Sequence, residues 1–295
     1  MHKPNLFIVG VPKAGTTSMH NYLAQHPEIF MSPYKEPYYF ASDLNFSWRV
    51  KELHQYLSLF NFSGTPKYIG ESSPGYMYSK VAAQQIKEFC PTAKIIVLLR
   101  NPSEMLYSLH GQLLSTAHED ILDFEEALSA QEDRRQGKRT PKCCDELKIL
   151  LYFDVAQYSS QLKRYLDLFG YENVHIILFE DFSKNTAIAY RKTLKFLEVD
   201  PNFEASFDVH NRAKSLPNLA VRSFLFKHPA LKALFRKVLP VSWVAGARES
   251  LGRLTQPQRP KTIDLAVRVR LRQQFQSEIE ELSRLLDRDL THWLS

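Results

Sequence analysis

Short apolar runs alternate with longer segments of helical spacing along this chain. The runs at 6–10, 94–99 and 174–179 have the character of buried strands, and 68–71 is a weaker fourth strand. The run KIIVLL at 94–99 is the strongest, because an unbroken apolar stretch is typical of a central parallel strand covered on both faces. We therefore predict four strands.

The segments between and after these runs carry apolar residues at helical spacing. Residues 118–148 are charged and irregular, and we expect a helix and an exposed loop there. Strands that alternate with helices over short connections indicate a parallel sheet with helices on both faces. We predict helices at 16–25, 79–90, 103–115, 152–169, 185–197 and 262–286.

Residues 208–262 break this rhythm with five prolines. We expect one domain over 1–295, in which 208–262 forms a lid or an acceptor-binding region. Within it, 224–247 mixes apolar and basic residues. Such a segment either covers the sheet, which we favour, or lies on an anionic membrane surface.

Composition and charge limit the ligands and the cellular location that we expect. The net charge of +6 suits a polyanionic ligand or a surplus of solvated surface cations. The three cysteines form no disulfide framework and have no metal-ligand spacing, so we expect no metal and a reducing, cytoplasmic location. We expect no signal peptide and no membrane-spanning helix, because the first apolar run begins by Leu6 and no apolar run is long enough to span a membrane. A nucleic-acid partner is not expected, because the basic residues are scattered.

The loop at 11–15 joins the first predicted strand to the first predicted helix. Backbone N–H groups at a helix start, together with the helix dipole, bind anions. Lys13 adds a full positive charge, and Gly15 lets the backbone approach a ligand closely. The loop therefore predicts a phosphate site, to which three consecutive residues add hydroxyl donors: Thr16, Thr17 and Ser18.

This loop differs from the phosphate loop of nucleoside triphosphatases. Gly10 and Gly15 have the right spacing, but Thr16 occupies the position of the usual lysine. The strand 94–99 ends at Arg100, where those enzymes commonly place an aspartate for Mg²⁺. Because arginine binds anions and aspartate binds metals, the pattern predicts a nucleotide held without metal.

These features resemble the sulfotransferases that use 3′-phosphoadenosine-5′-phosphosulfate (PAPS). Residues 12–18, PKAGTTS, resemble the family's 5′-phosphosulfate loop, and Arg100 followed by Ser108 resembles its 3′-phosphate site. Residues 179–182 with 195–199 resemble the family's later strand–helix segment, and residues 289–293 resemble the usual end of bacterial members. The resemblance implies an α/β fold, a P-loop-like three-layer α/β/α sandwich with a central parallel sheet.

The resemblance also implies roles for individual residues. Arg100 and Ser108 would hold the 3′-phosphate, and Arg212 would close over the nucleotide. Lys13 would stabilise the leaving phosphate, and 3′,5′-bisphosphoadenosine would be the product. The residues that would cradle the 5′-phosphosulfate are Lys13, Ala14, Gly15, Thr16, Thr17 and Ser18.

The general base is expected in the sequence KEPYYF at 35–40. This stretch resembles one in heparan sulfate-type sulfotransferases, whose glutamate deprotonates a sugar hydroxyl, so Glu36 would take that role. Glu71 is an alternative base, and a surface Lys–Glu pair is the simpler interpretation of Glu36. Ser72 stands where heparan-type enzymes often carry lysine.

Three functions remain open on the sequence. We favour sulfuryl transfer from PAPS to a hydroxyl of a carbohydrate, a glycolipid or a small metabolite. A metal-dependent P-loop kinase or NTPase is disfavoured by the displaced Lys13 and by Arg100. A non-catalytic protein that binds 3′,5′-bisphosphoadenosine is the third alternative.

Overall fold

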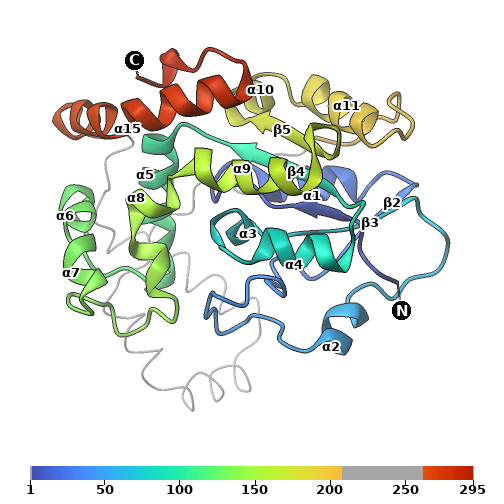
Figure 1. Ribbon diagram of the computed structural model, residues 1–295, viewed down its shortest axis with the longest axis horizontal. Helices are drawn as coiled ribbons and strands as arrows, with labels where there is room; N and C mark the ends of the chain where they lie inside the picture. The colour runs from blue at the N-terminus through green and yellow to red at the C-terminus, as the bar shows by residue number, and fades with distance from the viewer. Residues whose placement is uncertain (1, 208–261, 295) are drawn as a thin grey trace, which may run out of the picture.

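The structure is a computed structural model that describes residues 2–207 and 262–294 (Figure 1). Its centre is a parallel sheet of five strands in the order β2-β3-β1-β4-β5. The strands are β1 (Leu6–Ile8), β2 (Ile29–Met31), β3 (Tyr68–Ser72), β4 (Lys94–Leu99) and β5 (Val174–Leu178).

Strands β1 and β4 form the buried centre of this sheet. Leu6 of β1 pairs with Gly70 of β3 on one side and with Lys94 of β4 on the other. All three residues of β1, and residues 95–99 of β4, are fully buried. This burial explains the continuous apolar run in β4, because a central parallel strand is covered by helices on both faces, as the sequence predicted.

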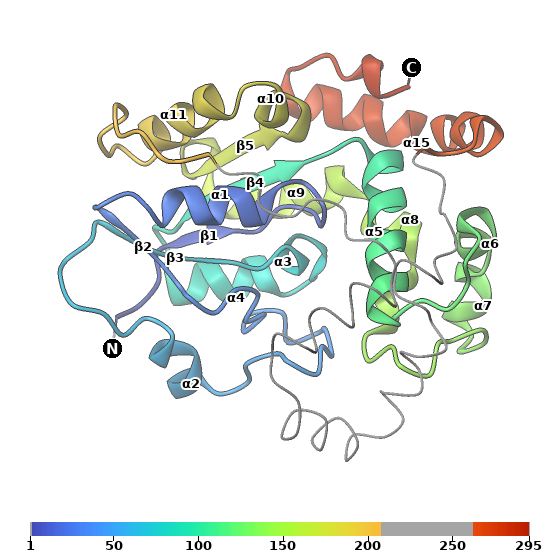
Figure 2. The same ribbon diagram turned by 180° about the vertical axis from the view of Figure 1, so that it is seen from behind.

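Helices cover both faces of the sheet and make a three-layer sandwich. Helices α3, α4 and α9 pack together on one face, in front of the strands in Figure 1. Figure 2, seen from behind, shows α1 and α11 over the other face. The first six helices are α1 (Thr16–Leu23), α2 (Leu53–Ser58), α3 (Gly75–Tyr78), α4 (Ala82–Phe89), α5 (Pro102–Thr116) and α6 (Phe124–Ser129).

The later helices follow the same pattern. Helix α15 packs on α9 and α5 and carries the chain to its C-terminal turn. These helices are α7 (Gln131–Arg135), α8 (Tyr152–Val155), α9 (Tyr158–Phe169), α10 (Phe179–Lys184), α11 (Thr186–Phe196) and α15 (Leu265–Leu286). Short 3-10 helices are η1 (Leu147–Leu150), η2 (Tyr171–Asn173) and η3 (Thr291–Leu294).

The predicted fold class is confirmed, with differences in single elements. Strand β2 was not predicted. The helix expected at 152–169 is two helices, α8 and α9, because the chain turns at Ala156 and Gln157. Strand β5 ends one residue early, since α10 begins at Phe179.

Gly10 fixes the direction in which the chain leaves β1. A Cβ atom at this position would lie 2.4 Å from the backbone nitrogen of Leu98 and 2.6 Å from its oxygen. The next residue, Val11, donates its N–H to the Leu98 carbonyl at 2.9 Å. Only glycine allows this contact, which guides residues 11–15 along the end of β4.

Part of the predicted organisation falls outside the described residues. This holds for 208–261 of the expected lid region, including Arg212 and the segment 224–247. Among residues 2–207 and 262–294, no helix has both the length and the apolar character needed to cross a membrane.

Candidate functional site

The predicted site residues follow different strands of the sheet. Lys13 follows β1, Glu36 follows β2 and Arg100 follows β4. The carboxyl ends of parallel strands meet at one edge, which is where open α/β sheets bind ligands. The topology therefore brings these three residues to a common edge, although they are far apart in the sequence.

The loop after β1 has the backbone of an anion site. Lys13 (φ 62°) and Gly15 (φ 89°) both lie in the left-handed region. A Cβ atom at Gly15 would lie 2.9 Å from the Phe182 ring, so the position requires glycine. Helix α1 begins directly afterwards at Thr16, and in the described structure no side chain caps it. Its first N–H groups have no partner within the helix and can serve an anion.

Arg100 is joined to this loop directly. Its Nη1 donates a hydrogen bond of 3.0 Å to the carbonyl oxygen of Lys13, and its guanidinium lies 4.7 Å from the centre of the Phe179 ring. Its guanidinium also lies 4.0 Å from the Glu104 carboxylate. Two cationic side chains are thus held close to one helix start.

The charges of these two cations affect each other. Burial lowers the pKa of the Lys13 ammonium most, and the charge of Arg100 lowers it further. Burial likewise lowers the pKa of Arg100. A bound phosphate or sulfate would relieve both effects, because it supplies negative charge between two partly desolvated cations. The site therefore fits an anionic ligand.

The surroundings of Arg100 include one residue that the sequence analysis missed. Ser108 lies half-buried on α5, two turns beyond Arg100. Tyr158, at the start of α9, is fully buried, and its hydroxyl has no hydrogen-bond partner in the described structure. Burial raises the pKa of the Tyr158 phenol, and the charge of Arg100 acts in the opposite direction. No local pattern marks Tyr158, because a tyrosine at a helix start is commonly a packing residue.

Glu36 is held from three sides. Its φ of 63° is left-handed, and its N–H donates to the Ser72 carbonyl at 3.0 Å. The Tyr38 hydroxyl donates to one carboxylate oxygen at 3.0 Å, and Lys35 pairs with the other at 2.5 Å. The side chain remains 35% exposed. It therefore combines a fixed position with access to a ligand.

The structure places Glu36 in the electrostatic neighbourhood of Lys13. After burial and Arg100, the Glu36 carboxylate is the next influence on the pKa of Lys13, and it acts in the opposite direction. Lys13 and Glu36 are therefore close enough for their charges to interact.

Glu71 has a different environment. Its side chain is fully buried, and its carboxylate accepts hydrogen bonds from Tyr56 (2.9 Å), Ser73 (2.6 Å) and Tyr76 (2.7 Å). Burial raises the pKa of this carboxyl to about 7, against the effect of the three hydroxyls. Because Glu71 is fully buried and the Glu36 side chain is 35% exposed, a ligand can reach Glu36 more readily than Glu71.

Comparison with known proteins identifies the family of this chain. Residues 3–223 match the family described as the sulfotransferase domain. The chain belongs to the sulfotransferase family. This sulfotransferase is also similar along its whole length to a solved sulfotransferase from Alicyclobacillus acidocaldarius, with a TM-score of 0.75, 25% identity and 100% of both chains covered.

Curated relatives share parts of this sulfotransferase. The human bifunctional heparan sulfate N-deacetylase/N-sulfotransferase 3 is 28% identical over 220 residues, which cover 70% of this chain and 24% of the relative. The rat carbohydrate sulfotransferase 15 is 26% identical, with 67% and 44% covered. The membrane-associated sulfotransferase kil1 of Dictyostelium discoideum is 38% identical over 103 residues, with 34% and 21% covered. The chain thus spans less than half of each of these relatives.

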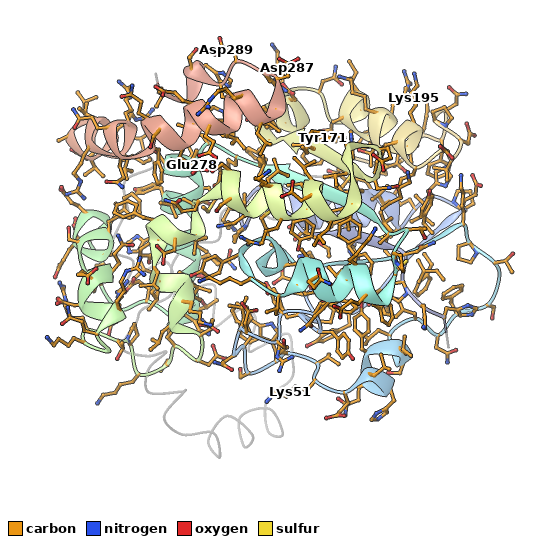
Figure 3. The ribbon with its side chains drawn as sticks, in the orientation of Figure 1. Lys51, Tyr171, Lys195, Glu278, Asp287 and Asp289 are labelled. Carbon is orange, nitrogen blue, oxygen red and sulfur yellow. The ribbon has the colours of Figure 1, made fainter. Side chains whose placement is uncertain are left out.

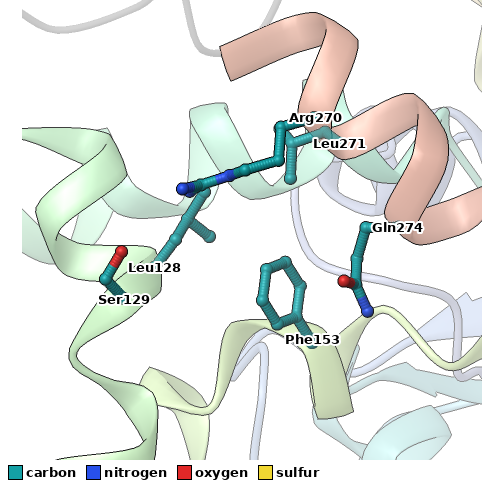
Figure 4. A pocket seen from close by; sticks show the side chains of 6 residues that line it. All are labelled: Leu128, Ser129, Phe153, Arg270, Leu271 and Gln274. Atoms are coloured by element: carbon teal, nitrogen blue, oxygen red, sulfur yellow. The ribbon is translucent and has the colours of Figure 1, made fainter.

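One other feature of this sulfotransferase lies apart from the strand ends. A cavity of about 240 Å³ lies between α6, α8 and α15 (Figure 4), and Arg270 beside it is paired with Glu125 at 2.8 Å. Its lining comes from Leu128, Ser129, Phe153, Arg270, Leu271 and Gln274. No group of three or more His, Cys, Asp or Glu residues suited to a metal occurs in the described ranges.

Proposed function

We propose that this protein transfers a sulfuryl group from PAPS to a hydroxyl group of its acceptor. The observation that carries the proposal is the hydrogen bond from Arg100 to the Lys13 carbonyl. It holds the cation after β4 next to the anion-binding loop after β1, which supports one ligand with two separate anionic groups, such as a nucleotide with 5′ and 3′ phosphates.

The donor residues divide between the two ends of this nucleotide. Lys13 and the N–H groups and hydroxyls of residues 14–18 hold the 5′-phosphosulfate, because they surround the start of α1. Arg100 and Ser108 hold the 3′-phosphate, since a guanidinium binds phosphate oxygens with two parallel hydrogen bonds. Arg212, which lies outside the described residues, is proposed to close over the nucleotide.

The transfer is an in-line displacement at sulfur. Glu36 accepts the proton of the acceptor hydroxyl, and the freed oxygen forms a bond to sulfur. The bond between sulfur and the bridging phosphate oxygen breaks, and that oxygen keeps the electron pair. Lys13 stabilises the developing negative charge, and 3′,5′-bisphosphoadenosine leaves.

The names of the relatives support a carbohydrate-type acceptor. Two of them are named for heparan sulfate and for carbohydrate. We therefore propose a carbohydrate, a glycolipid or a small hydroxylated metabolite as the acceptor. All three cysteines are free thiols, which supports the cytoplasm as the location of the reaction.

Two other functions make different predictions. A P-loop kinase or NTPase would consume ATP with Mg²⁺ and without PAPS. A non-catalytic binding protein would bind 3′,5′-bisphosphoadenosine but would not depend on Glu36. The Glu36 side chain, partly exposed beside Lys13, favours the enzyme over the binding protein.

The donor assignment is tested by replacing Arg100 with alanine. We expect Arg100→Ala to weaken binding of 3′,5′-bisphosphoadenosine by about 10- to 100-fold, because a charge-assisted hydrogen bond to phosphate is lost. Binding of adenosine 5′-monophosphate should change much less. Isothermal titration calorimetry measures both affinities.

The matched control is Arg135→Ala on α7, an arginine that is 42% exposed and pairs with Asp154. It should leave both affinities unchanged. Equal losses for the two nucleotides in Arg100→Ala would contradict the 3′-phosphate assignment.

A further inference from the structure

Two partly exposed aromatic residues lie beside Glu36. Tyr34 is 41% exposed and Trp48 is 39% exposed, and the Tyr34 hydroxyl donates to the Trp48 carbonyl at 3.4 Å. We call this pair the aromatic platform. The ring of Trp48 lies 6.4 Å from the ring of Tyr38, whose hydroxyl binds the Glu36 carboxylate. The platform is therefore one aromatic ring away from the proposed base.

The Trp48 ring is exposed but held in place. Phe46 stacks against it at 5.0 Å, and His118 meets it edge-on at 5.9 Å. The backbone on either side is also fixed. The N–H of Ser47 binds the Asp145 carboxylate at 2.5 Å, and the N–H of Val50 binds the Pro37 carbonyl at 2.9 Å. A ligand that stacks on Trp48 therefore meets a preformed surface and does not bear the entropy cost of ordering it.

The position of the platform determines what can contact it. The acceptor oxygen must come within hydrogen-bond reach of Glu36 to lose its proton. The rest of the acceptor then extends over the residues around Glu36, and the aromatic platform is part of that surface. The occupant of the platform is therefore the acceptor itself.

The chemistry around Trp48 fits a sugar ring. A pyranose has C–H groups on one face, which pack on an aromatic ring, and hydroxyls around its edge. Polar groups lie close to Trp48: His118 meets the edge of its ring, and the Tyr34 hydroxyl donates to its backbone carbonyl. A small aryl acceptor would instead call for an apolar slot that encloses most of its surface.

Resting on the function proposed above, we propose that Trp48 stacks on the saccharide unit that bears the accepting hydroxyl. The acceptor is then a glycan or a glycoside, and Trp48 determines its affinity and orientation. Tyr34 supports Trp48 through its hydrogen bond to the Trp48 carbonyl.

The test compares Trp48→Ala and Trp48→Phe in the full-length enzyme, with radiolabelled PAPS as donor. The acceptor probes are chitotetraose, maltotetraose and 2-naphthol. With the oligosaccharide that wild type uses, we expect Trp48→Ala to raise the acceptor KM by about tenfold or more, a loss of about 1.4 kcal/mol. Trp48→Phe should recover most of this loss, because it restores an aromatic face. Wild type should prefer an oligosaccharide to 2-naphthol.

The matched control is Tyr171→Ala. Tyr171 is 65% exposed and precedes β5, at the opposite edge of the sheet from Glu36. Figure 3 shows it far from Lys51, which follows Trp48 by three residues. This variant should keep the wild-type KM. All variants should keep the thermal shift that 3′,5′-bisphosphoadenosine produces.

A binding measurement covers the case in which no probe is sulfated. Each oligosaccharide is titrated into the enzyme with and without the bisphosphate while tryptophan fluorescence is followed. We expect a change that Trp48→Phe abolishes. The proposal would be overturned by an unchanged acceptor KM in Trp48→Ala or by a wild-type preference for 2-naphthol. It would also be overturned if no oligosaccharide were sulfated and none gave a fluorescence change that depends on Trp48. Failure of the proposed function would instead appear as no thermal shift with the bisphosphate.

Discussion

Lys13 and Glu36 adopt a backbone conformation that L-amino acids avoid. Their φ values of 62° and 63° each cost about 1–2 kcal/mol. The surroundings compensate, since Arg100 binds the Lys13 carbonyl and the Glu36 N–H binds the Ser72 carbonyl. Strain of this kind is kept where it directs a side chain, and both residues have proposed chemical roles.

The raised pKa of Glu71 predicts how the stability of the protein depends on pH. Its pKa is raised to about 7 in the folded protein, from an ordinary value of 4.5. The protonated form therefore stabilises the fold below pH 4.5, and this contribution is lost as the pH rises through 7. Relative to Glu71→Gln, the wild-type free energy of unfolding should fall by about 3 kcal/mol between pH 4 and 8.

Urea unfolding of both proteins over this pH range measures the difference. If the free energies of unfolding of wild type and Glu71→Gln changed in parallel with pH, Glu71 would have the same pKa in the folded and unfolded states.

At the scale of elements, the junction of β1, its loop and α1 depends on Gly15. We expect Gly15→Ala to lower the free energy of unfolding, because the left-handed backbone is strained and the new methyl group meets Phe182. It should also weaken binding of 3′,5′-bisphosphoadenosine. Urea unfolding and calorimetry provide the two measurements.

Gly137→Ala is the matched control for this substitution. Gly137 has a φ of 74°, but no atom lies within 4 Å of the Cβ position. It carries the backbone strain without the crowding. Gly15→Ala should therefore cost about 1 kcal/mol or more beyond Gly137→Ala. Equal costs, with unchanged nucleotide affinity in both, would mean that the junction tolerates the methyl group.

The sequence predicted those elements that a few consecutive residues are enough to define. The strand at 94–99 and the loop at 11–15 were found because an apolar run and a glycine-containing turn can be read within a few residues. Strand β2 was missed, since three residues are too few to show a period. Tyr158 was missed as well, because its neighbour Arg100 is brought to it only by the fold.

At the scale of the whole molecule, the site combines segments from both ends of the chain. The C-terminal turn η3 packs on the ends of β4 and β5. Asn101 donates to the Trp293 carbonyl at 2.9 Å, and the Trp293 indole donates to Glu180 at 2.7 Å. The residue after Arg100 is therefore fixed by a partner 192 positions away. Contacts of this length cannot be read from local pattern, although the resemblance to known sequences pointed to the same segment.

Single-turnover transfer of ³⁵S from PAPS tests whether this protein transfers a sulfuryl group with Glu36 as the base. With the acceptor that wild type uses fastest, Glu36→Gln should slow transfer by about 100-fold or more, because the proton has no acceptor. Its affinity for 3′,5′-bisphosphoadenosine should stay at the wild-type value. Transfer by Glu36→Gln at the wild-type rate would contradict the role of Glu36 as base, and no ³⁵S transfer to any acceptor by wild type would contradict the proposed function.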